Sequence, residues 1–192
     1  MKIMIASDLH GSSKYCRALL DAHACERPDK LLLLGDLLYH GPRNDLPEGY
    51  APKQVIAMLN PLAASIVAVR GNCEAEVDQM VLDFPCMAAY STILDPTATR
   101  SADGSERTTP GCELFLTHGH VYGAGFHNSV DRLPELPQGS VLLYGHTHKK
   151  VSEPAPGHDG VWAFNPGSVS IPKDGTHSCG MYEDGALRHI VL

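Results

Sequence analysis

The feature that most constrains the fold is a repeated arrangement of short apolar runs that end in polar residues. Five runs share this arrangement, and each is followed within a few positions by Asp, Asn or His. They are residues 3–7 before Asp8 and His10, 31–34 before Asp36, 66–70 before Asn72, 114–117 before His118 and His120, and 141–144 before His146 and His148. In an open α/β sheet, ligands bind outside the carboxyl ends of the strands. We therefore expect the five runs to be strands whose ends bring these side chains into one crevice.

These strand ends supply more donor atoms than one metal ion needs. The seven candidate ligands are Asp8, His10, Asp36, Asn72, His118, His146 and His148. Their mixture of carboxylate, imidazole and amide groups suits manganese, iron, cobalt or zinc better than magnesium or calcium. Two ions about 3.5–4 Å apart can acidify a bridging water and hold a phosphate for in-line attack. The sequence therefore predicts two divalent ions that share a carboxylate, and hydrolysis of phosphate esters.

The same motifs resemble those of a known family. Asp8-x-His10, Gly35-Asp36, Gly71-Asn72, His118-Gly119-His120 and Gly145-His146-x-His148 occur in the order found in calcineurin-like metallophosphoesterases. Segments 6–11, 41–52, 69–74 and 165–173 are similar to those of the YfcE-type bacterial phosphodiesterases within that superfamily. The likeness covers nearly the whole chain and is weakest between residues 95 and 111.

The resemblance implies a fold, a ligand assignment and a reaction. The implied fold is α/β, a four-layer α-β-β-α sandwich of two mixed β-sheets flanked by helices, as a single domain over residues 1–192. Asp8, His10, Asp36 and His148 would hold the first ion, and Asp36, Asn72, His118 and His146 the second. Asp36 is therefore the bridging ligand, and Asp36, Asn72 and His118 are the expected catalytic residues. The implied enzyme is a phosphoric diester hydrolase in which a hydroxide between the ions attacks phosphorus. Manganese is the favoured metal, with zinc, iron(II), cobalt or nickel as alternatives.

Cys73 departs from the commoner family pattern, in which a histidine follows the Gly-Asn pair and protonates the leaving group. A cysteine thiol has a reference pKa of about 8.5, and two nearby cations favour its thiolate. A thiolate is a poor proton donor. We therefore predict a preference for small phosphodiesters, such as aryl esters, whose leaving group departs without a proton.

Cys73, His120, Arg43 and Asn44 are the candidates for substrate positioning. His120 either contacts the substrate or the metal ligands, or makes an ordinary hydrogen bond. Arg43 and Asn44 follow the second polar turn, where they either orient a phosphate or brace the loop. The sequence leaves these alternatives open.

The composition fits a compact enzyme and disfavours several classes of partner. With 192 residues, 43% of them hydrophobic, the chain is long enough for one domain with a sizeable core. Its formal net charge is −7 and it has no basic run, which disfavours binding to long nucleic acids. No apolar run approaches the roughly 18 residues of a membrane span. The six cysteines form no CxxC pair, so we expect free thiols and a cytoplasmic protein, while a homo-oligomer is suggested by the family likeness alone.

The segments between the apolar runs predict helices and a C-terminal group of strands. Ser12 or Ser13 is expected to cap a helix that ends near Cys25, and Pro52 to begin a second helix that ends at Leu59. A third helix is expected over residues 74–82, and short strands over residues 161–164, 180–183 and 186–192. Residues 95–111 contain many turn-forming residues, so we expect an exposed loop or hairpin tip there. The alternative is a cap over the site or an oligomer contact.

Three other functions remain open from the sequence. A phosphomonoesterase would use the same site, because the expected charge of the metal centre tolerates either ester. A protein-interaction scaffold would keep the fold and the metal site without turnover. A thiol sensor built on Cys73 has no partner cysteine nearby in sequence, although Cys86 and Cys112 are candidates in space.

Overall fold

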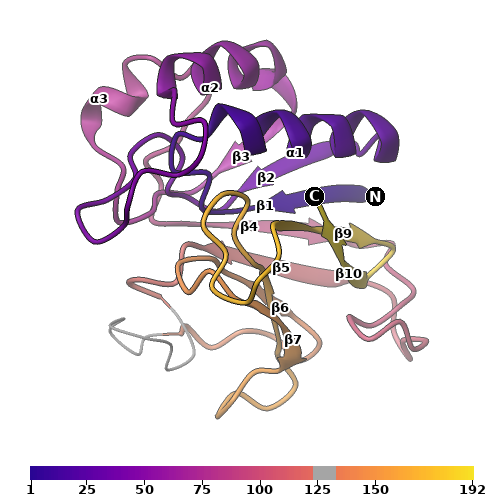
Figure 1. Ribbon diagram of the computed structural model, residues 1–192. Helices are drawn as coiled ribbons and strands as arrows, with labels where there is room; N and C mark the ends of the chain where they lie inside the picture. The colour runs from indigo at the N-terminus through magenta and orange to yellow at the C-terminus, as the bar shows by residue number, and fades with distance from the viewer. Residues whose placement is uncertain (123–132) are drawn as a thin grey trace.

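The computed structural model describes residues 1–122 and 133–192, and its frame is a pair of five-stranded mixed sheets (Figure 1). The first sheet, in the order β10-β9-β1-β2-β3, consists of β1 (Lys2–Ala6), β2 (Lys30–Leu33), β3 (Ile66–Ala68), β9 (Ser178–Glu183) and β10 (Ala186–Val191). The second, in the order β4-β5-β6-β8-β7, consists of β4 (Tyr90–Asp95), β5 (Cys112–Thr117), β6 (Val141–Leu143), β7 (Lys150–Pro154) and β8 (Trp162–Pro166). Strands β1, β2 and β3 are parallel, as are β5, β6 and β8. Each sheet therefore gathers three carboxyl ends at one edge.

The side chains of β1 alternate between the two layers that the strand separates. Ile3 and Ile5 are fully buried between the sheets, in a cluster that includes Leu114 and Leu143. Met4 is fully buried on the opposite face, in a cluster that includes helix residues. Successive strand residues point to opposite faces, so a strand covered on both faces needs a continuous apolar run. This explains why the first apolar run of the chain lacks alternation.

Two helices cover the outer face of the first sheet (Figure 1). They are α1 (Ser13–Glu26) and α2 (Pro52–Leu59), and the 3₁₀-helix η1 (Asn60–Ser65) follows α2. Ser12 caps α1, because its side chain accepts a hydrogen bond from the Tyr15 N–H at 3.3 Å. Pro52 stands in the first turn of α2, where its missing N–H has no helical partner. Both predicted helices are confirmed.

The third helix is much shorter than predicted. The helix α3 covers only Glu76–Gln79, whereas the sequence predicted a helix over residues 74–82. Glu74 lies outside the helix because its buried side chain bonds to neighbouring turns. The Gln79 side chain donates to the carbonyls of Leu82 and Phe84 at 3.3 and 3.0 Å. Side-chain bonds to the backbone thus replace further helical turns here.

The outer face of the second sheet is covered by coil in the part of the chain that the structure describes. Phe115, Leu142 and Tyr144 are buried on this face, with Tyr122 and Leu136 packed against them. The two mixed sheets with flanking helices confirm the predicted fold class, and among the described residues the helical layer covers the first sheet only. The described helices all lie on the side of the first sheet (Figure 1).

The segment of residues 95–111 lies at the end of the sandwich opposite to the polar turns. Most of its residues are exposed, as predicted, but Ala98 and Ala102 are buried in the core between the sheets. The Thr99 N–H and hydroxyl donate to the Asp184 carboxylate at 2.8 and 2.6 Å. Asp184 in turn bonds to the carbonyl of Met1, at the start of the chain. The segment therefore closes one end of the core, and the alternative of a cap over the site is wrong.

The C-terminal strands complete both sheets close to their predicted positions. Strand β8 pairs with β6 in the second sheet, while β9 and β10 extend the first. All six cysteines are free, as expected. Among the helices of the described residues, none has the length and apolar character to cross a membrane.

Candidate metal centre

The polar turns that follow β1, β2, β3, β5 and β6 are in direct contact. The Asp8 N–H donates to the carbonyl of Gly35 at 3.1 Å, and the Gly145 N–H to the carbonyl of His118 at 3.0 Å. At Gly35 a side chain has no room, because a Cβ atom would lie 2.5 Å from the Gly71 backbone nitrogen. The glycine therefore allows two ligand-bearing turns to approach each other closely.

Five of the candidate ligands share an unusual backbone conformation. They have positive φ angles: Asp8 58°, His10 45°, Asp36 56°, His146 66° and His148 59°. Among the other non-glycine residues that are described, only Arg27 and Asp184 do so. Left-handed conformations of such residues cost about 1–3 kcal/mol each and cluster at functional sites. The strain thus marks these turns as the functional region of the molecule.

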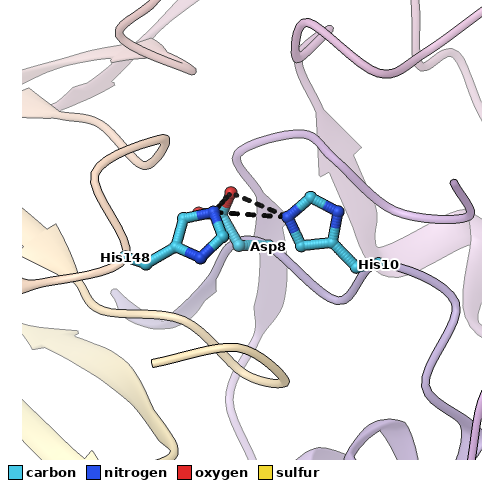
Figure 2. A group of neighbouring side chains, drawn as sticks. All are labelled: Asp8, His10 and His148. Atoms are coloured by element: carbon cyan, nitrogen blue, oxygen red, sulfur yellow. Dashed lines mark hydrogen bonds and ion pairs between the residues drawn. The ribbon is translucent and has the colours of Figure 1, made fainter. Parts of the chain in front are cut away.

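Asp8, His10 and His148 form a first cluster of donor atoms (Figure 2). Oδ1 of Asp8 lies 3.1 Å from Nε2 of His148 and 3.6 Å from Nε2 of His10. The two Nε2 atoms are 3.3 Å apart. All three side chains are buried. The cluster joins the turn after β1 in one sheet to the turn after β6 in the other, as the sequence predicted.

Asp36 connects this first cluster to a second, which consists of Asp36, Asn72 and His118. Its Oδ2 atom lies 3.7 Å from Nε2 of His10 and 3.5 Å from Nε2 of His118. Beyond it, Nε2 of His118 lies 3.1 Å from Oδ1 of Asn72. One carboxylate oxygen therefore stands between the imidazoles of the two clusters.

Backbone carbonyls fix the orientation of three imidazole rings. In each ring Nδ1 donates to a carbonyl: His10 to Tyr39 at 2.8 Å, His118 to Leu34 at 2.6 Å and His148 to Ile171 at 2.7 Å. In a neutral ring whose Nδ1 carries the proton, Nε2 is left with a lone pair. Such carbonyl partners are the usual means of orienting metal-binding histidines.

The donor atoms fit divalent cations. The Nε2 lone pairs of His10 and His148, 3.3 Å apart, repel each other unless a proton or cation lies between them. Oδ1 of Asp8 is buried and, among the described residues, has no hydrogen-bond donor. Ligand atoms bound to one ion at about 2.1 Å lie about 3.0–3.4 Å apart. The shortest separations in both clusters fall in this range.

Without a cation, protons take its place. Burial lowers the pKa of His118, but the neighbouring Asp36 and Asp8 carboxylates outweigh burial and raise that pKa to about 10. Burial raises the pKa of Asp36, yet His118 and His10 together lower it to about 2. At neutral pH the metal-free site therefore holds a His118 imidazolium beside an Asp36 carboxylate.

We expect the affinity for metal to increase with pH. His118 keeps its proton up to about pH 10 in the metal-free chain, so an ion that binds this ring must displace the proton. Manganese affinity measured by titration calorimetry should rise about tenfold per pH unit between about pH 6 and 8. A pH-independent affinity, with no proton release in buffers of different ionisation enthalpy, would argue against His118 as a ligand.

His146 and His120 flank the second cluster. Their ring centroids lie 5.1 and 5.3 Å from that of His118. Burial and the nearby His118 charge lower the pKa of both rings to about 4, so both are neutral. The His146 N–H donates to Oδ2 of Asp8 at 3.1 Å, which holds its turn against the first cluster. In the described part of the chain, neither ring belongs to a compact group of donor atoms.

Glu74 is a site residue that sequence reasoning missed. Its side chain is 4% exposed, and its carboxylate accepts from the Asp36 N–H at 3.0 Å and the Leu37 N–H at 2.6 Å. The Gly71 N–H also donates to it. Burial, then the Asp36 charge, raises the pKa of Glu74. Glu74 thus ties the turn of Asp36 to the turn of Asn72. Its place directly after a ligand turn was the available signal.

An open pocket of about 190 Å³ lies beside the two clusters. Its lining residues are Asp36, Gly41, Pro42, Arg43, Asn44, Asn72, Cys73, His146, Thr147, His148 and Lys173. The Asn44 side chain donates to the His40 carbonyl at 2.8 Å, so Asn44 braces the loop. Arg43 is exposed at the pocket. The predicted positioning residues Arg43, Asn44 and Cys73 therefore border the same space.

Cys73 follows Asn72 at the wall of this pocket. Its thiol accepts from the Asn72 side-chain amide at 3.2 Å, and its N–H donates to Oδ1 of Asp36 at 2.9 Å. In the metal-free chain, burial and then the Asp36 charge raise the pKa of Cys73. This is the opposite of the effect expected from bound cations, so the thiolate depends entirely on the metals.

The end of β8 and the segment that follows it support the ligand turns from outside the pocket. The Asn165 amide donates to the Gly145 carbonyl at 2.8 Å and to Oγ1 of Thr147 at 3.1 Å. The Ser168 hydroxyl donates to the Asp8 carbonyl at 2.9 Å. These bonds hold the turns of two candidate ligands in place across the two sheets.

The fold and this centre are those of a metallophosphoesterase. Residues 1–184 match the Calcineurin-like phosphoesterase superfamily domain, and the chain belongs to this superfamily. Among its relatives, the chain is similar to Phosphodiesterase YfcE of Escherichia coli strain K12. The two are 45% identical over 193 residues, which cover 100% of this chain and 92% of that protein.

Solved structures agree with this relationship. The structure of YfcE, a phosphoesterase from E. coli, superposes with a TM-score of 0.80 at 45% identity and covers 95% of this chain and 88% of its own. An archaeal phosphodiesterase has a TM-score of 0.61 at 22% identity over 100% of both chains, a likeness that supports the fold alone. The predicted superfamily and YfcE-type relationship are therefore confirmed.

Proposed function

We propose that this protein hydrolyses phosphodiesters at a centre of two divalent ions. The observation that carries the proposal is the position of Asp36 Oδ2 between His10 and His118. Asp8, His10, Asp36 and His148 would hold the first ion. Asp36, Asn72, His118 and His146 would hold the second, with His146 approaching from its position beside His118.

The chain supplies orientation and charge for this reaction. When bound, the two ions provide Lewis acidity that activates water and neutralises the phosphate. The Asp8 and Asp36 carboxylates contribute two negative charges against the four positive charges of the ions. The positive remainder attracts an anionic ester into the pocket beside Asn72 and Cys73. The carbonyl partners of His10, His118 and His148 keep the donor atoms in place as substrates enter.

Diesters are the preferred substrate class in this proposal. The support is the 45% identity to a protein named as a phosphodiesterase. Manganese is the preferred metal because the donor set mixes carboxylate, imidazole and amide groups. The charge of the centre is compatible with monoesters as well, which makes a monoester the proper comparison substrate.

The test is hydrolysis of bis-p-nitrophenyl phosphate against p-nitrophenyl phosphate by chelator-treated protein. Manganese, zinc, nickel and magnesium would be added back separately. The proposal predicts that manganese restores cleavage of the diester with a higher kcat/KM than that of the monoester. Preferential monoester cleavage would reassign the substrate class. Metal binding without cleavage of either ester would favour a scaffold function instead.

Replacing Cys73 with histidine should accelerate cleavage of poor leaving groups most. An imidazolium at the pocket wall can protonate a departing alkoxide, and general acid catalysis of this kind contributes about 10²–10⁴-fold. We expect kcat/KM for alkyl phosphodiesters to rise at least about tenfold in Cys73→His, with little change for p-nitrophenyl esters. The Cys73→Ser variant is the control, because it removes the thiol without adding an imidazole. Equal effects across a series of leaving groups would rule out this role.

A further inference from the structure

Two basic side chains border the pocket beside the metal centre, and one of them, Lys173, was not among the predicted site residues. We propose that Arg43 and Lys173 form an anion subsite, and that the natural substrate is a phosphodiester with a further negative charge on its non-leaving arm. This inference rests on the proposed function, because it concerns the same pocket. The charged group would be a carboxylate or a phosphate.

Hydrogen bonds link the segments that carry both residues to the metal centre. The Lys173 N–H donates to the His148 carbonyl at 2.9 Å, and the His148 ring donates to the carbonyl of Ile171 at 2.7 Å. Arg43 belongs to the loop after Asp36, and the carbonyl of Tyr39 in that loop accepts from the His10 ring at 2.8 Å. Each basic residue therefore lies in a segment bonded to a proposed ligand of the first ion.

Among the described residues, neither Arg43 nor Lys173 has a carboxylate partner. In residues 1–122 and 133–192, the ion pairs of Lys and Arg involve Lys2, Lys14, Lys150 and Arg188. Asp174, the neighbour of Lys173, is already engaged, since it pairs with Lys150 at 2.8 Å and accepts the Lys150 N–H at 2.7 Å. Of the pocket-lining residues in the described part of the chain, Asp36 is the only one with a carboxylate. Arg43 and Lys173 thus present uncompensated positive charge.

A simple diester does not require this extra charge. Its single negative charge lies on the phosphate, which the two ions of the proposed centre would neutralise. The pocket of about 190 Å³ has room beside the phosphate for a small polar group. In a chain with a formal net charge of −7, two unpaired cations beside one pocket select for anionic groups. The chemistry therefore points to a second anion on the substrate.

The test uses three p-nitrophenyl phosphodiesters that share one leaving group and differ in the other arm. The arms are propyl, carboxypropyl and phosphonooxypropyl, so they are neutral, carboxylate-bearing and phosphate-bearing. We expect the manganese-loaded protein to show a kcat/KM about fivefold or more higher for at least one charged arm than for propyl. A preference for phosphate alone would identify that anion, and a similar preference for carboxylate would identify a general subsite.

Substitutions then assign the preference to the two residues. Arg43→Met and Lys173→Met should each lower the charged-to-neutral ratio about two- to fivefold, and the double variant should abolish the preference. Lys53→Met is the matched control, because Lys53 is exposed on α2 and does not line the pocket. It should keep the wild-type ratio. Thermal unfolding of each variant verifies that it is folded.

Two outcomes would overturn the inference and can be told apart. If the wild-type protein cleaves the propyl ester but shows no preference for either charged arm, the subsite is absent while the proposed function stands. If the preference survives in the double variant, Arg43 and Lys173 do not form the subsite, and the proposed function again stands. If the metal-loaded wild type cleaves none of the three esters, the proposed function fails and the inference fails with it.

Discussion

Replacing Asp36 with asparagine is expected to abolish nearly all turnover. Oδ2 of Asp36 lies between His10 and His118, so the proposed centre relies on this atom for both ions. An amide keeps the size of the side chain but removes its charge and one of its two oxygen donors. Partners that only orient metal ligands account for 10–100-fold in affinity or activity, so a shared ligand should cost about 10³-fold or more in kcat/KM.

The control for Asp36→Asn is Asp21→Asn, which makes the same chemical change at an exposed position of α1. Activity and bound manganese should be unchanged in the control. His120→Ala should cost less than Asp36→Asn, because His120 lies beside the clusters and outside their donor groups. Wild-type turnover in Asp36→Asn, with the fold verified by its melting temperature, would refute the bridging role.

Glu74→Ala is expected to lower both stability and activity. Its carboxylate is the acceptor for the N–H groups of Asp36, Leu37 and Gly71. Each buried N–H left without a partner costs about 1–3 kcal/mol, so the loss of three partners should lower the free energy of unfolding by about 3 kcal/mol or more. The released turns carry Asp36 and Asn72, so kcat should also fall about 10–100-fold at saturating manganese.

The matched control is Glu76→Ala, which removes an exposed carboxylate from the first turn of α3. Urea unfolding of the three proteins separates a specific role of Glu74 from a general loss of negative charge. The control should remain within about 0.5 kcal/mol of the wild type. Glu74→Gln should be intermediate in stability, because its carboxamide keeps one oxygen acceptor. If Glu74→Ala unfolds like the control, the carboxylate does not hold the two turns.

The sequence was most informative where residues able to bind metals directly follow a buried strand. Runs of buried residues such as 31–34 predict strands because both faces of the first sheet are covered. The polar residue after each run is then placed by topology, which is why Asp8, Asp36 and His148 could be expected together before any coordinates. Ser12 and Pro52 located two helices because they act through local backbone bonds.

What could not be predicted depends on contacts between distant segments. Glu74 resembles an acidic residue in the first turn of a helix, and its place after the Asn72 turn does not reveal that its carboxylate bonds to the Asp36 turn. Ala98 and Ala102 lie in a polar stretch, yet packing buries them between the sheets. Lys173 reaches the pocket because its segment bonds to His148, a pairing that no local pattern encodes. The Gly145-His146-x-His148 motif did not indicate that the His146 ring would lie next to His118 but outside the compact groups of donor atoms in the described residues.

Anomalous diffraction from crystals grown with manganese is the most direct test of the two-ion centre. We expect two peaks about 3.5–4 Å apart, one on each side of Asp36 Oδ2, with His10 and His148 at the first and Asn72 and His118 at the second. A single peak would contradict this expectation. So would an ion held by Cys73 with His10 and Asp36, whose donor atoms also lie within 4.8 Å of one another.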